Sequence, residues 1–65
     1  MHSTLIKPGV AYVSKLKERA RRVQRIENGM VFYRSESIFS YGLLSLPLEI
    51  FADWAYQTAK LRREN

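Results

Sequence analysis

The sequence predicts a mainly α fold (small α or α+β) in a single small domain spanning residues 1–65. Two stretches, about 10–27 and 47–63, carry apolar residues at helical spacing, and a short β-like or irregular segment over 30–44 joins them. A chain of 65 residues supports one domain with a small core. Hydrophobic residues make up 46% of the chain, which argues against intrinsic disorder.

The first 27 residues predict an arm followed by a helix. Residues 1–8 are expected to form a flexible or short-strand arm, because Pro8 and Gly9 interrupt the chain there. Over about 10–27, a helical projection gathers one apolar face, made of Tyr12, Val13, Leu16, Ala20, Val23 and Ile26. Asn28 and Gly29 suit the left-handed end of a helix. They also suit a β-hairpin turn, but the preceding residues lack strand alternation, which favours the helix.

The middle and the C-terminal part predict one short strand and a second helix. Met30 to Tyr33 is a β-branched and aromatic run typical of a strand. Ile38 to Tyr41 fits a second strand, or Ser35 caps a short helix toward Leu44, and both alternatives stay open. Pro47 suits the first turn of a helix over about 47–63. The apolar arc of that predicted helix is broad, so we expect the helix to be covered on two sides.

The positive charge lies in the first part of the chain. The net charge is +5, and residues up to Glu27 include seven basic and two acidic side chains, whereas four of each follow. The basic side of the first helix is the expected binding surface, formed by Lys15, Lys17, Arg21, Arg22 and Arg25. Phosphate oxygens require several donors at fixed spacing, so we expect a nucleic-acid-binding or regulatory protein. The alternative is a protein–protein interaction module, such as an inhibitor or adaptor from a phage or mobile element, that docks on an acidic patch.

Apolar and aromatic side chains suggest further contacts. On the second helix, the candidates for a partner groove or a homodimer seam are Ile50, Trp54 and Leu61, although the core of this protein is the simpler role for that arc. Phe32, Phe51 and Trp54 are expected in the core. The tyrosines carry a polar end, so the surface candidates are Tyr33, Tyr41 and Tyr56.

The sequence predicts no enzyme, cofactor, metal site or small-molecule substrate. There is no cysteine, and the one histidine, His2, lies at the N-terminus, which disfavours zinc sites and an activated serine. Glu49 and Asp53 are expected to be a solvated pair at a helix start. No leader and no apolar run of about 20 residues is present, so the expected location is the cytoplasm and a membrane partner is disfavoured. A ribbon–helix–helix pattern fails, because the first predicted helix is too long and Pro47 interrupts the second.

Overall fold

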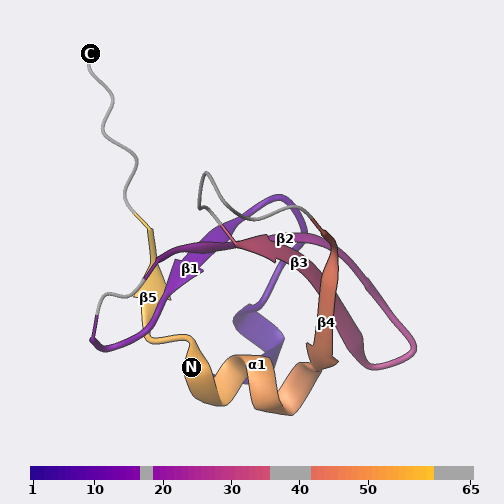
Figure 1. Ribbon diagram of the computed structural model, residues 1–65. Coiled ribbons are helices and arrows are strands. Elements are labelled where there is room, and N and C mark those ends of the chain that lie inside the picture. The colour runs from indigo at the N-terminus through magenta and orange to yellow at the C-terminus, as the bar shows by residue number, and fades with distance from the viewer. Residues whose placement is uncertain (17–18, 36–41, 60–65) are drawn as a thin grey trace.

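The computed structural model, which describes residues 1–16, 19–35 and 42–59, is an antiparallel β-sheet covered by a short helix (Figure 1). The prediction of a mainly α fold with two amphipathic helices is therefore wrong. Five strands form one sheet in the order β4-β3-β2-β1-β5. Their bounds are Ala11–Val13 (β1), Arg21–Glu27 (β2), Met30–Ser35 (β3), Leu44–Pro47 (β4) and Gln57–Thr58 (β5). The helices of the described residues are α1 (Leu48–Trp54) and a 3₁₀ turn, η1 (Ser3–Leu5).

The Asn28–Gly29 pair forms the turn of a β-hairpin and does not end a helix. Glu27 pairs with Met30 across a two-residue loop whose φ angles are 49° at Asn28 and 77° at Gly29. Two positive φ angles characterise a type I′ turn, whose twist matches that of the adjoining strands. Because residues before this turn belong to β2, the predicted helix over 10–27 is wrong. The strand predicted at Met30 to Tyr33 is confirmed as part of β3.

A β-bulge at Gln24 explains why the alternation of β2 is hidden in the sequence. Val23 pairs with Tyr33 and Arg25 pairs with Phe32, so Gln24 is an extra residue without a partner on β3. An extra residue shifts all later side chains to the other face of the sheet. Val23 therefore faces the core before the bulge, and Ile26, which is three residues later, packs on the core after it. The core-facing residues of β2 therefore do not follow a strict period of two along the sequence.

The predicted helix over 47–63 ends at Trp54, because the following residues pair with the free edge of β1. Tyr56 N donates to Val13 O at 2.8 Å, and Ala59 N donates to Ala11 O at 2.9 Å. These bonds satisfy backbone groups that an open strand edge would leave unpaired. Tertiary pairing thus overrides the helical propensity of this stretch. The alternatives for Ile38 to Tyr41 lie outside the described residues.

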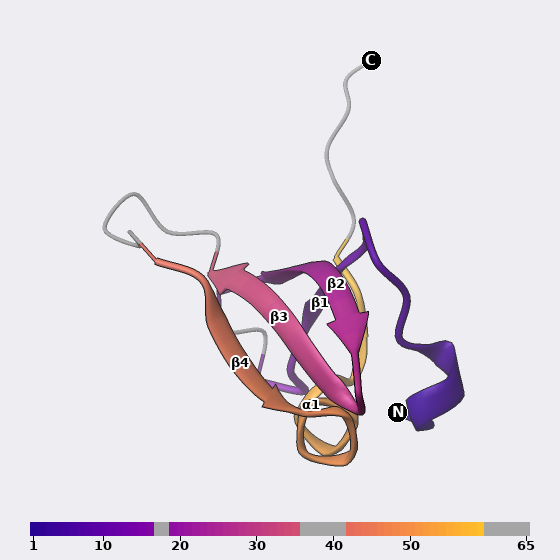
Figure 2. The same cartoon turned by 90° about the vertical axis from the view of Figure 1, so that its right-hand side faces the viewer.

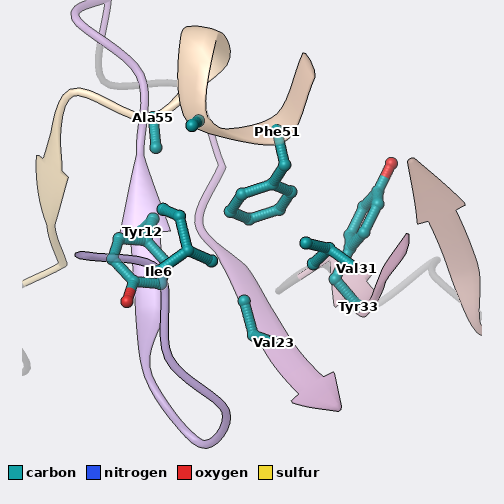
Figure 3. Close-up of a cluster of buried hydrophobic side chains, with 8 residues drawn as sticks. Ile6, Tyr12, Val23, Val31, Tyr33, Phe51 and Ala55 are labelled. Atoms are coloured by element: carbon teal, nitrogen blue, oxygen red, sulfur yellow. The ribbon is translucent and has the colours of Figure 1, made fainter. Parts of the chain in front are cut away.

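The core lies between the concave side of the sheet and α1. The sheet curves over α1 in Figures 1 and 2, and the side chains that fill the space are shown in Figure 3. Phe51 is fully buried, and its ring centroid lies 5.9 Å from that of Tyr12 and 5.4 Å from those of Tyr33 and Trp54. Val23 and Val31 complete the fully buried set on the sheet. Tyr33 is only 6% exposed, so its predicted surface position is wrong.

The N-terminal segment is bonded to the core and to the end of α1. The Tyr12 hydroxyl donates to Leu5 O at 2.9 Å and accepts a hydrogen bond from Lys7 N at 2.8 Å. The α-amino group of Met1 donates to Ala52 O at 2.8 Å and to Ala55 O at 2.9 Å. Cationic donors are favourable at a helix C-terminus, where backbone carbonyls lack helical partners. These hydrogen bonds hold the N-terminal segment beside Tyr12 and the C-terminal end of α1.

Candidate functional site

The convex side of the sheet is the surface that the described helices and strands leave open. In Figure 1, α1 lies on the concave side, and none of the described helices covers the convex side. The strand register assigns side chains to the two sides, since directly paired residues of an antiparallel sheet share a face. The buried pair Val23 and Tyr33 faces α1. The neighbouring pair Arg22 and Arg34 therefore points to the convex side.

Three arginines and one phenylalanine lie on this side, and we call Arg22, Arg25, Arg34 and Phe32 the arginine face. Arg25 and Phe32 form the next convex pair beyond the bulge. The Arg25 guanidinium carbon lies 4.4 Å from the centroid of the Phe32 ring, a cation–π distance. Arg25 Nε also donates to Glu27 Oε1 at 3.2 Å, and the Arg25 side chain remains 52% exposed.

The opposed pair of arginines gives this surface its electrostatic character. Arg22 and Arg34 lie directly opposite each other on β2 and β3. Like charges at such positions destabilise a sheet, whereas favourable cross-strand pairs contribute up to about 1 kcal/mol. Arg22 Nη1 donates to Gly9 O at 3.2 Å, and Arg34 is exposed. Among the described residues of β2, β3 and β4, Glu27 is the only acid, and its carboxylate contacts Arg25.

The structure brings together only part of the predicted basic surface. Arg22 and Arg25 lie on the arginine face, but Arg21 lies on the concave side of the sheet. Its guanidinium carbon is 4.1 Å from the Trp54 ring centroid and 5.2 Å from that of Tyr33. The predicted line of basic residues along a helix is therefore wrong, because consecutive residues of a strand alternate between faces.

Of the other two members of the predicted basic set, one is described by the structure. Lys15 is exposed in the turn after β1. Lys17 lies outside the described residues. Lys15 does not belong to the arginine face.

The predicted partner contacts are not gathered into one surface. Ile50 is 50% exposed on α1. Trp54 instead lies between Arg21 and the ring of Phe51. The indole Nε1 of Trp54 is buried and has no hydrogen-bond partner among the described residues. Leu61 lies outside the described residues.

Two residues of the arginine face, Phe32 and Arg34, were not among the predicted site residues. Phe32 was expected in the core, but it lies on the convex side and is only partly buried. The signal that identifies both residues is the alternation along β3, read outward from a hairpin turn at Asn28 and Gly29. Met30, Phe32 and Arg34 then share one face, and the apolar residues between them face the core.

Within the part of the chain that the structure describes, no helix has the length and apolar character needed to cross a membrane. No family model, no curated protein and no solved structure matches the chain.

Proposed function

We propose that this protein is a small, non-enzymatic, nucleic-acid-binding or regulatory protein whose binding surface is the arginine face. The observation that carries the proposal is the direct opposition of Arg22 and Arg34, with Arg25 one step further along β2. Like charges directly opposite each other in a sheet repel, and a polyanion bound to both arginines would offset that repulsion. Guanidinium groups bind phosphate through two parallel hydrogen bonds, which suits arginine better than lysine to this role.

The charge balance of the described residues supports the same proposal. Seven described lysines and arginines face three described acids, and two of those acids, Glu49 and Asp53, belong to α1 on the other side of the sheet. A potential of one sign over a surface steers oppositely charged polymers toward it. The cysteine-free sequence is compatible with a reducing compartment, and we place the protein in the cytoplasm as part of this proposal.

Binding of labelled oligonucleotides, measured by fluorescence anisotropy over a salt series, tests the proposal. Three phosphate contacts predict that log K falls with log salt at a slope of about −2 on a single strand. Arg34→Glu should weaken binding, and loss of its contact should make the slope shallower by about 1. Lys7→Glu is the matched control, because it changes the net charge by the same amount at an exposed residue outside the strands.

Two results would overturn this assignment. Absence of binding at low salt by the wild-type protein would remove nucleic acid as the partner. Equal effects of Arg34→Glu and Lys7→Glu would show that only the overall charge matters. In the first case the rival function, an interaction module for an acidic protein surface, becomes the better explanation of the opposed arginines.

A further inference from the structure

The arginine face contains an aromatic residue as well as basic ones, and this composition bears on which class of nucleic acid it binds. Phosphate contacts alone require only basic side chains, but this face also contains an aromatic ring, directly opposite Arg25. Phe32 is paired with Arg25 on one side and with Ser45 of β4 on the other. No helix of the described residues lies on the convex side (Figure 1), where Phe32 is partly buried beside the Arg25 guanidinium. An aromatic ring and a guanidinium both offer a planar group on which a base can stack.

We infer that the arginine face binds single-stranded nucleic acid, with one unpaired base stacked on the Arg25–Phe32 pair. This inference rests on the proposed function and adds the class of nucleic acid to it. Bases stack on aromatic rings and also on guanidinium planes, and here the Arg25 guanidinium carbon lies over the Phe32 ring, 4.4 Å from its centroid. Arg34 lies two residues from Phe32, about 7 Å along the strand, where it can contact a phosphate beside the stacked base.

The position of β2 and β3 inside the sheet disfavours duplex DNA. A two-stranded ribbon fits the major groove, which is about 12 Å wide. Here β1 and β4 flank the hairpin, so the four strands span about 14 Å between their outermost backbones. The free hairpin tip could enter a groove, but the convex residues nearest to it are Glu27 and Met30. A flexible single strand can instead lie flat on the sheet.

Comparison of a thymidine 12-mer with an abasic oligomer of the same length separates stacking from charge. The abasic oligomer keeps the phosphates and lacks the bases. We expect the wild-type protein to bind the thymidine oligomer about 5- to 150-fold more tightly, the range that one stacked base provides. A uridine 12-mer, compared in the same assay, distinguishes RNA from DNA as the better single strand.

Two substitutions locate the stacked base, and a third is the control. Phe32→Leu keeps apolar volume and removes the ring, and Arg25→Lys keeps the charge and removes the planar group. Both should reduce the preference for the base-containing oligomer, with no change in its slope against salt. Arg21→Lys also removes a stacked guanidinium, but on the concave side, and it should leave both affinities unchanged.

Equal binding of the thymidine and abasic oligomers by the wild-type protein would overturn this inference and leave the proposed function intact. A preference that survives Phe32→Leu would also overturn it, because the base would then stack elsewhere. Tighter binding of a 12-bp duplex than of either single strand would contradict the steric argument. Failure of every oligomer to bind would instead refute the proposed function.

Discussion

Deletion of Gln24 from the middle of β2 should leave the protein folded. The remaining residues Arg22, Val23, Arg25 and Ile26 would then alternate regularly and keep the faces that they have now. The Gln24 side chain donates a long hydrogen bond of 3.5 Å from Nε2 to Arg22 O. Loss of that bond costs at most about 1 kcal/mol. The deletion also removes the twist that a bulge adds, so we expect no net gain in stability. We therefore expect a decrease in Tm of up to roughly 8 °C.

Deletion of Val23 is the matched control, because it moves Gln24 into the core position that Val23 fills. The change loses about 1.5–3 kcal/mol of apolar burial and adds about 1–3 kcal/mol for burying an amide. A domain of 65 residues has a total stability of roughly 3–10 kcal/mol, so this variant should be largely unfolded. Far-UV circular dichroism melts of both variants measure the difference. Equal unfolding by the two deletions would refute the assignment of Gln24 as the bulged residue.

Other substitutions test the core, the N-terminal segment and the arginine face. Phe51→Ala should cost about 3–5 kcal/mol in urea denaturation, because it empties the centre of a ring cluster. Tyr12→Phe should cost about 1–3 kcal/mol and speed amide hydrogen exchange before β1, since two backbone groups lose their partner. Arg34→Thr should raise the free energy of unfolding by about 0.2–1 kcal/mol in the same denaturation assay, because it removes one of two opposed charges. A loss of stability from Arg34→Thr would contradict the proposed repulsion.

The strand content of the first half was hard to predict because local and long-range signals disagree there. Residues 15–25 contain six lysines and arginines and one glutamine, which are good helix formers. The bulge at Gln24 also shifts the apolar positions by one, which removes the alternation expected of a strand. The Asn28–Gly29 pair was the stronger signal, since its two positive φ angles fit a hairpin turn.

The end of α1 depends on contacts between distant segments. Residues 55–59 turn away from the helix and bond to β1, more than forty positions earlier in the chain. Nothing local in the sequence requires this, because alanine and glutamine are helix formers. The start of α1 was more predictable, and Pro47 immediately precedes it.

The candidate site was predictable in its charge and not in its geometry. The excess of basic residues before Glu27 is evident in the sequence, and Arg22 and Arg25 belong to the arginine face. Their partner Arg34 follows the hairpin turn, so only the register of β2 and β3 brings it opposite Arg22. The separation of Arg21 to the concave side follows from the same register.

A titration followed by ¹H–¹⁵N correlation spectra, with the wild-type protein and a thymidine 12-mer, tests the central claim most directly. Chemical-shift changes should concentrate on backbone and side-chain signals of the arginine face, with Arg25, Phe32 and Arg34 among the largest. Signals of α1, such as those of Ile50 and Asp53, should move little. Changes centred on α1, or no changes at saturating oligomer, would contradict the assignment of the convex side as the binding surface.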